Sequence, residues 1–218
     1  MNTLQKFLNW LPPLLAGARI TISLTLVSVL AGLLLGVILA LGSMSKRRVL
    51  KSLSKAYIFF FRGTPLLMQL YFVYYGLPEI CEALTINNKF LAAFIAFALN
   101  SGAYCSEIFR SAIQSIDKGQ MEAGKVLGLS YLQTMRLIIL PQSIKRLIPP
   151  VGNEFIMMLK DASLVSIIAL ADITKVTRSI QSSTASSLVY IPAMILYLII
   201  TAVFTVFFHW LEKKNTYE

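Results

Sequence analysis

The chain has 218 residues, of which 56% are hydrophobic and only 14% are charged, and its mean hydropathy is +0.70. Soluble domains carry about 25% charged residues, so the composition argues against a soluble protein and indicates an integral membrane protein with a single domain, residues 1–218. The formal net charge of +10 does not indicate nucleic-acid binding, because the basic residues cluster just beyond hydrophobic runs and form no stripe with interleaved aromatic residues.

The first predicted transmembrane helix covers residues 18–43. Its centre, residues 20–42, carries no charge, and a helix that rises about 1.5 Å per residue crosses the roughly 30 Å of hydrocarbon within that length. The run is too long for a signal-peptide core, so we expect it to be retained. Before it, residues 2–10 form a short amphipathic stretch that ends at Pro12 and Pro13 and is predicted to lie on the membrane surface.

The second predicted span covers residues 53–77 and contains the sequence Arg62-Gly63-Thr64-Pro65. Proline removes a backbone donor and disfavours helix at the residue before it, so a break or kink is expected there. Backbone groups freed by a break can line a cavity, which makes Arg62 and Thr64 candidate substrate-binding residues. The alternative is a plain kink with no role in binding.

The third predicted span covers residues 90–116 and contains several polar side chains. A charge near the bilayer centre costs about 2.5–3.5 kcal/mol, so such residues are functional candidates. Glu107 and Arg110 are three residues apart and share a helix face, either as a structural ion pair or as part of a substrate site. Asn100 and Ser101 lie near the centre of the span and either bind substrate or hydrogen-bond neighbouring helices.

The fourth predicted span covers residues 143–159 and contains Asn153 and Glu154. Asp161 and Ser163 follow at its outer end. Two acidic side chains that face one cavity favour a cationic ligand, such as an amino acid with a basic side chain. The alternative is that Lys160 neutralises Asp161 and only a neutral gate remains. A fifth span at residues 188–210 completes an all-α integral membrane fold with five transmembrane helices.

The polar insert at residues 117–128 is predicted to form a short helix between the third and fourth spans. Asp117 is a good N-cap with Gln120 at the third helical position, and Gly128 suits a C-terminal stop. Ser130 and Gln133 have capping-box spacing, which predicts a second short helix over residues 130–140 that Pro141 interrupts. Small side chains on the first helix, including Gly119, allow another protein to approach closely; the alternative is a solvated hairpin without a partner.

The distribution of basic residues predicts the orientation. Most of the 20 Lys and Arg residues fall on the side that holds residues 46–55, the insert and Lys213-Lys214. The positive-inside rule makes this side cytoplasmic. The N-terminus is therefore expected outside, and the insert and the C-terminus in the cytoplasm.

The sequence contains no constellation typical of an enzyme or a metal site. Cys81 and Cys105 lack metal-ligand spacing, and His209 is the only histidine. Gly124-Lys125 is followed by Val126, whereas a phosphate-binding loop needs a longer Gly-rich lead and a Ser or Thr after the lysine. The chain is therefore expected to bind no metal and no cofactor. If transport is driven by ATP, the ATPase must be another polypeptide.

Several motifs together resemble one family. Glu122-Ala123-Gly124, followed by Gly128 and by Ile139-Leu140-Pro141, resembles the EAA motif of ABC-importer membrane subunits. Gly124 departs mildly from this motif, which usually has Ala there. Four further stretches within residues 20–180 resemble the polar amino acid permeases of the histidine, glutamine and arginine type, namely Phe61–Leu67, Tyr104–Arg110, Gln114–Gln120 and Asn153–Leu164.

The resemblance implies an ABC importer type I permease fold and a prokaryotic cytoplasmic (inner) membrane location. It implies that residues 117–128 form a coupling helix in a cleft of ABC ATPase subunits, which bind the ATP and Mg. The ATPase-docking residues implied by position are Gln120, Glu122, Ala123, Gly124 and Gly128. It also implies an extracytoplasmic amino-acid-binding protein and a homodimer, or a heterodimer with a similar permease, surrounded by membrane lipid.

The sequence alone leaves the substrate open. The local charge favours basic amino acids such as arginine, lysine or histidine, while the family also imports glutamine, glutamate and cystine-like substrates. A secondary transporter driven by an ion gradient is the alternative from another class. Five spans are few for such a transporter, and we see no inverted repeat.

Overall fold

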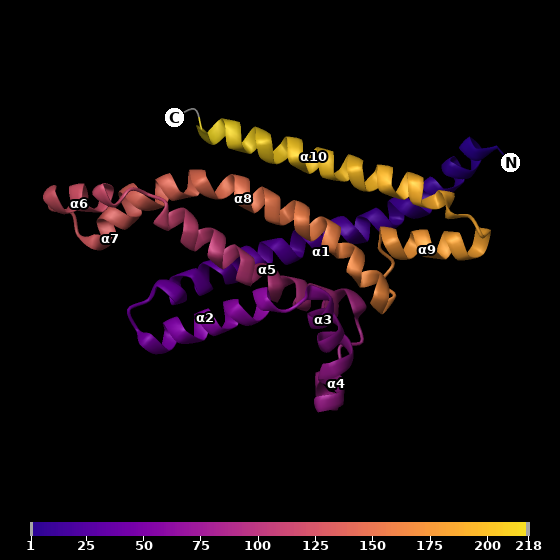
Figure 1. Ribbon diagram of the computed structural model, residues 1–218, viewed down its shortest axis with the longest axis horizontal. Helices are drawn as coiled ribbons and strands as arrows, with labels where there is room; N and C mark the ends of the chain where they lie inside the picture. The colour runs from indigo at the N-terminus through magenta and orange to yellow at the C-terminus, as the bar shows by residue number, and fades with distance from the viewer. Residues whose placement is uncertain (1, 217–218) are drawn as a thin grey trace.

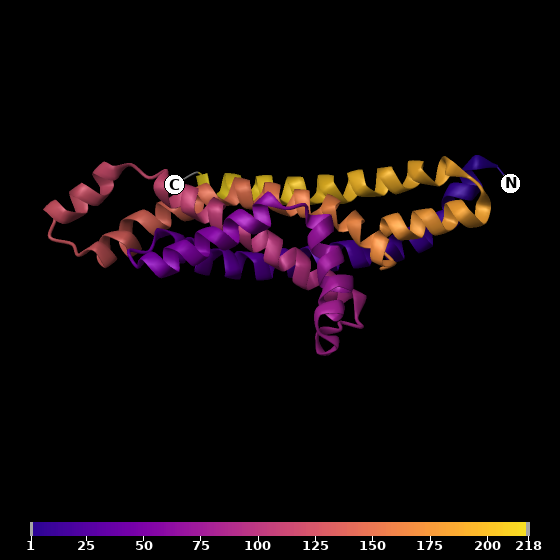
Figure 2. The ribbon, with the colours of Figure 1, turned by 60° about the horizontal axis from the view of Figure 1, so that its bottom comes forward.

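The computed structural model describes residues 2–216, and within them all regular structure is helical. Figure 1 shows an elongated bundle in which α1, α5, α8 and α10 run along the long axis. The N-terminus and α9 lie at one end, whereas the α6–α7 hairpin lies at the other end, toward which α10 and the C-terminus also run. The turned view in Figure 2 shows the same separation of the two ends.

The first helix, α1, is continuous from Thr3 to Met44, so the separate surface stretch expected at residues 2–10 is wrong. Pro12 and Pro13 lie inside the helix and do not end it. The surrounding side chains Trp10 and Leu14 are buried against α9 and α10, and this packing outweighs the local loss of backbone hydrogen bonds. At about 1.5 Å per residue, the 42 residues extend about 60 Å.

The second helical segment breaks where the sequence predicts it. α2 runs from Arg48 to Gly63 and α3 from Leu66 to Tyr71, and the two directions differ by 102°. The chain continues through a π-helical turn at Phe72–Gly76, α4 at Leu77–Ile80 and a 3-10 turn at Glu82–Leu84. The segment around α3 and α4 therefore projects sideways from the bundle (Figure 1).

The remaining elements are the long helix α5, the short α6–α7 hairpin, and the helices α8, α9 and α10. α5 begins after Asn88, whose side chain accepts hydrogen bonds from the backbone N–H groups of Phe90 and Leu91. The other elements are α5 (Lys89–Gln114), α6 (Lys118–Val126), α7 (Tyr131–Thr134), a π-helical turn (Met135–Ile139), α8 (Leu140–Asp161), a 3-10 segment (Ala162–Ile168), α9 (Ile173–Thr184), a 3-10 turn (Ser187–Val189) and α10 (Tyr190–Thr216).

Pro141 does not interrupt the helix after the insert, contrary to the sequence prediction. α7, the π-helical turn and α8 follow one another without a gap, with Pro141 in the first turn of α8. A proline in a regular α-helix collides with the carbonyl four residues earlier. The wider π turn before it changes that local geometry, and π turns often occur at such irregularities. The same order, a π turn followed by Leu-Pro, occurs at Leu77-Pro78.

Small residues allow α1 and α5 to pack closely. A Cβ atom on Gly32 would lie 2.6 Å from the Cβ of Ser101, and one on Gly36 would lie 2.6 Å from the Cβ of Cys105. Real Cβ atoms do not approach this closely, so larger side chains at these two glycines would separate the helices. This contact positions the polar residues of α5.

The structure supports fewer spans by length and apolarity than the five predicted. Within the described residues, three helices are long and apolar enough to cross a membrane: Thr3–Met44, Lys89–Gln114 and Ser187–Asn215. The bent pair Arg48–Gly63 and Leu66–Ile80 makes a fourth if it is one span. The predicted span at residues 143–159 lies wholly within α8, but α8 is not among these helices. The number five therefore stays a prediction.

Candidate functional site

Two buried amides hold the break between α2 and α3. The Asn100 side chain, from α5, donates to Phe61 O at 3.1 Å and to Gln69 Oε1 at 3.0 Å. The Gln69 side chain donates to Phe61 O at 3.0 Å, Thr64 O at 3.1 Å and Thr64 Oγ1 at 2.8 Å. These bonds satisfy carbonyl groups that the proline-induced break leaves without helical partners. The two donor bonds of Asn100 show that this residue links helices, one of its two expected roles.

Glu154 lies inside the bundle at the contact between α8 and α5. Its side chain accepts a hydrogen bond from Ser101 Oγ at 2.9 Å, and the residue is only 7% exposed. The ion pairs formed within residues 2–216 do not include Glu154. A buried carboxylate with a single hydroxyl partner has strong remaining capacity to accept hydrogen bonds from a cation.

A cavity of about 250 Å³ lies beside Glu154 and the helix break. It brings together four of the residues predicted from the sequence, namely Thr64, Asn100, Glu154 and Asp161. The other lining residues are Pro65, Leu66, Tyr104, Met157, Met158 and Leu164. We call this space the transport cavity. Its lining contains two carboxylates and no lysine or arginine, so it suits a positively charged ligand.

Five of the predicted residues do not line this cavity, namely Arg62, Ser101, Glu107, Asn153 and Ser163. Asn153 is exposed and does not line the transport cavity. Ser163 lines a different, mainly apolar pocket of about 390 Å³, together with Lys160 and residues of α10. Helical periodicity explains both placements. Asn153 comes one residue before Glu154 and points about 100° away around the helix, and Ser163 comes two residues after Asp161 and points about 200° away.

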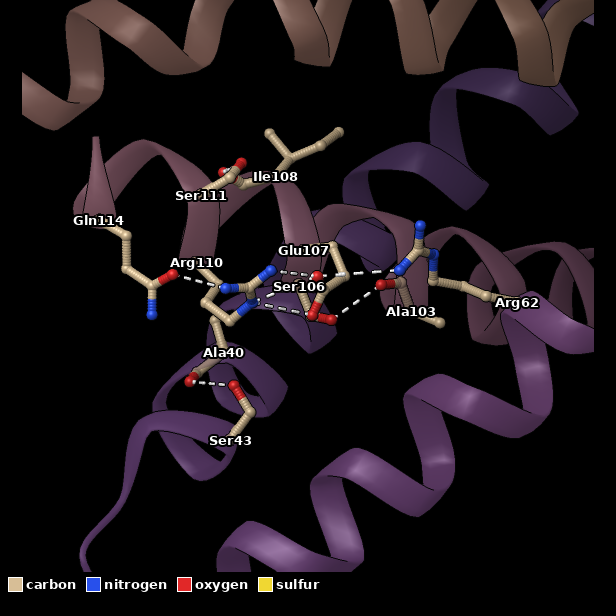
Figure 3. Close-up of polar contacts among 10 residues, drawn as sticks. All are labelled: Ala40, Ser43, Arg62, Ala103, Ser106, Glu107, Ile108, Arg110, Ser111 and Gln114. Carbon is tan, nitrogen blue, oxygen red and sulfur yellow. Dashed lines mark hydrogen bonds and ion pairs between the residues drawn. The ribbon is translucent and has the colours of Figure 1, made fainter.

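Glu107 and Arg110 form the ion pair that their spacing suggested. Arg110 Nη2 lies 2.6 Å from Glu107 Oε2, and Arg110 Nε donates to both carboxylate oxygens at 3.0 and 3.2 Å. Arg62 approaches the same carboxylate at 3.8 Å, and its guanidinium lies 5.4 Å from the centre of the Tyr104 ring. Figure 3 shows both arginines pointing at Glu107. This carboxylate is therefore occupied by protein cations, beside and not within the transport cavity.

Tyr104 and Gln69 were missed in the sequence analysis. Tyr104 is one helical turn from Asn100 on α5, so an i, i+4 spacing rule could have included it. Gln69 lies four residues after the proline, and no local pattern marks it, since its partners are reached only because the chain bends by 102°.

The polar insert is a capped helical hairpin, as predicted. Asp117 accepts a hydrogen bond from Gly119 N at 2.6 Å, and Ser130 and Gln133 form a reciprocal capping box. Gly128 has a φ of +76°, and the Leu129 N–H donates to Gly124 O at 2.9 Å, which is the Schellman ending of α6.

The tip of this hairpin exposes apolar side chains together with four of the predicted docking residues. Gln120, Glu122, Ala123 and Gly128 are exposed. The large apolar residues exposed around the turn are Val126, Leu127, Tyr131 and Leu132, of which Val126 is 87% exposed. An exposed apolar patch with a charged rim is typical of a protein interface.

Gly124 is the exception among the predicted docking residues, because it is buried inside the hairpin. A Cβ atom at this position would lie 2.6 Å from both Cγ2 and Oγ1 of Thr134 on α7. The glycine is therefore required by the contact between α6 and α7. This explains within the chain why the usual alanine of the EAA motif is absent.

Comparisons with known proteins agree on one class. The family described as "Binding-protein-dependent transport system inner membrane component" matches residues 32–217. The chain therefore belongs to this family of membrane permeases. The similarity to its relatives identifies it as a permease subunit of an amino-acid ABC importer. Subunits of this class are not themselves enzymes.

The individual relatives differ in their named substrates. The L-cystine permease TcyB of Bacillus subtilis is 39% identical, over 93% of this chain and 86% of that protein. The arginine permease ArtQ of B. subtilis is 40% identical over 81% and 78% of the two chains, and the glutamine permease GlnP of Escherichia coli K12 is 35% identical over 94% and 93%.

Solved structures show the same fold. A crystal structure of an amino acid ABC transporter with histidines aligns with a TM-score of 0.92 and 37% identity, over 98% of this chain and 99% of that one. The MetNI methionine transporter aligns with a TM-score of 0.77 and 16% identity, over 99% and 100% of the two chains, which shows the fold alone. The chain thus has the type I permease fold of ABC importers.

Proposed function

We propose that this chain carries a cationic amino acid, such as arginine, lysine or histidine, through the prokaryotic cytoplasmic membrane. The observation that supports the proposal most directly is the lining of the transport cavity, where Glu154 and Asp161 are both present without a basic residue. The cavity volume of about 250 Å³ leaves room for a small ligand or several water molecules.

The alternative in which Lys160 neutralises Asp161 has less support. Lys160 lines the separate pocket that contains Ser163, not the transport cavity. The ion pairs among residues 2–216 do not include a Lys160–Asp161 pair. Its charge still acts on the Asp161 carboxyl through space, so Asp161 is the weaker of the two anionic groups for a ligand.

ATP hydrolysis is assigned to separate ATPase subunits that bind ATP and Mg. The exposed apolar tip of the α6–α7 hairpin supports its role as the element that docks in them, with the exposed residues Gln120, Glu122, Ala123 and Gly128 as contacts and the buried Gly124 shaping the hairpin. We place this end and the C-terminus in the cytoplasm and the N-terminus outside, with five spans in total. A binding protein delivers the amino acid from outside, and a second permease chain, identical or similar, completes the pathway.

A substrate of the glutamine, glutamate or cystine type is the second candidate. The relatives named for cystine and glutamine favour it, as do the neutral polar groups of Asn100 and Tyr104 in the cavity. An ion-gradient-driven carrier has less support, because the whole chain aligns with an ABC permease.

The test compares uptake of labelled arginine and glutamine by proteoliposomes that contain the chain with its ATPase and binding protein. Replacing Glu154 by Gln should reduce arginine uptake by about tenfold or more, since removal of a buried charge partner costs several kcal/mol. Glutamine uptake, if present, should change much less. The matched control is Asn153→Ala, one residue away but outside the cavity. Equal losses for both amino acids would contradict a cationic substrate.

A further inference from the structure

A second polar cavity, of about 530 Å³, lies between the end of α1, the first half of α2 and the second half of α5. It is lined by Ser43, Met44, Lys51, Lys55, Glu107, Arg110 and Gln114. Lys51 and Lys55 are one helical turn apart and therefore project from the same face of α2. In contrast to the transport cavity, this basic cavity has three cationic side chains and one carboxylate.

The single carboxylate of the basic cavity is already occupied. Glu107 is bound by Arg110 and approached by Arg62, as Figure 3 shows. Neither Lys51 nor Lys55 takes part in the ion pairs formed within residues 2–216. The cations of this cavity outnumber its one carboxylate, so they repel each other, and an anion placed between them reduces this repulsion.

The start of α2 adds to the positive potential. α2 is 16 residues long and begins at Arg48 with no side-chain cap and no acidic residue in its first turn. The N-terminus of a helix carries a partial positive charge, which favours anions and disfavours nearby cations. This helix nevertheless has Arg48 and Lys51 in its first turn, directly after Lys46 and Arg47. An uncapped helix start beside unpaired lysines is a favourable setting for an anion.

We propose that the basic cavity binds a phosphate group, which comes either from the headgroup of an anionic phospholipid or from a soluble phosphate. Lysine ammonium groups bind phosphate as point charges, and arginine adds directed donors. Basic pockets between membrane helices are known to receive anionic headgroups. The proposal does not depend on which amino acid is transported.

The test uses the full chain purified in detergent and stripped of lipid. Its melting temperature is measured against phosphatidylglycerol, phosphatidylcholine and inorganic phosphate. Phosphatidylglycerol should raise the melting temperature and phosphatidylcholine should not. The double variant Lys51→Gln/Lys55→Gln should weaken the apparent affinity about thirtyfold, since each lysine near an anionic surface contributes about a fivefold factor.

The matched control is Lys213→Gln/Lys214→Gln, which removes the same charge from the last turns of α10 outside the cavity. A shift with phosphatidylglycerol alone identifies a lipid, and a comparable shift with inorganic phosphate identifies a soluble phosphate; both support the site. Unchanged phosphatidylglycerol affinity in the Lys51/Lys55 variant, or an equal loss in the control, overturns the proposal. Because both lysines are exposed and glutamine keeps most of their aliphatic stem, the variant is expected to fold.

Discussion

Gly124 shows how a single departure from a family pattern can be explained inside the chain. Its Cα faces Thr134 so closely that a methyl group at position 124 would lie 2.6 Å from two atoms of that side chain. The sequence predicted that this small residue admits a partner protein, whereas the structure shows that it admits α7. Small residues on a short helix do not reveal from the sequence which neighbour they accommodate.

Replacing Gly124 by Ala should destabilise the hairpin by about 1–3 kcal/mol, the usual cost of overpacking. The double variant Gly124→Ala/Thr134→Ala should recover most of this loss, because it removes the two atoms that the new methyl group would meet. Limited proteolysis of the hairpin in the purified chain measures the difference. If the single and double variants were cleaved equally fast, the proposed collision would be refuted.

The elements of this fold were predicted well where local chemistry decides them. The helix break at Gly63–Pro65, the caps of α6 and α7 and the Gly128 turn all depend on residues close in sequence. The helix through Pro12 and Pro13 was not predicted, because packing of α1 against distant segments decides it. The π turn before Pro141 was not predicted either, since no pattern in the sequence marks it. The transport cavity was predicted in part: Glu154 and Asp161 line it, whereas Asn153 and Ser163 do not, and Tyr104 was missed.

The amide network across the α2–α3 break provides a prediction for Gln69. Replacing Gln69 by Leu removes three donor contacts, to Phe61 O, Thr64 O and Thr64 Oγ1. The variant should lose about 1–3 kcal/mol of stability, because the Thr64 carbonyl loses its side-chain donor and the Asn100 amide loses its Gln69 acceptor, whereas Phe61 O keeps its bond from Asn100. Thermal unfolding in detergent measures this loss. The control is Gln142→Leu, because the Gln142 side chain donates to Ile138 O in the π turn directly before α8 and does not connect distant segments. An equal effect of both variants would argue against the network.

At the scale of the whole molecule, the two ends of the bundle are formed by different elements. The α6–α7 hairpin lies at one end, and the N-terminus and α9 lie at the other (Figures 1 and 2). The projecting segment around α4 carries Cys81, which is exposed, whereas Cys105 is buried in the contact of α5 with α1. The native cysteines therefore report on orientation without engineered labels.

A membrane-impermeant maleimide should label Cys81 in cells with an intact cytoplasmic membrane if the proposed orientation is correct. Cys105 should stay unmodified, because it is fully buried. Mass spectrometry of the purified chain locates the label, and Cys81→Ser should abolish it. Labelling of Cys81 only after the membrane is permeabilised would reverse the orientation.

The close seam between α1 and α5 has a mechanical consequence. The backbone of α1 at Gly32 and Gly36 packs directly against Ser101 and Cys105 of α5. Sliding one helix along the other would therefore bring side chains into collision. If a movement of the α6–α7 hairpin is passed on to α5, α1 must move together with α5 as one rigid unit. The bending needed for a conformational change during transport would then occur where the helices are interrupted. These places are the break at Thr64–Pro65 and the π turn before Pro141.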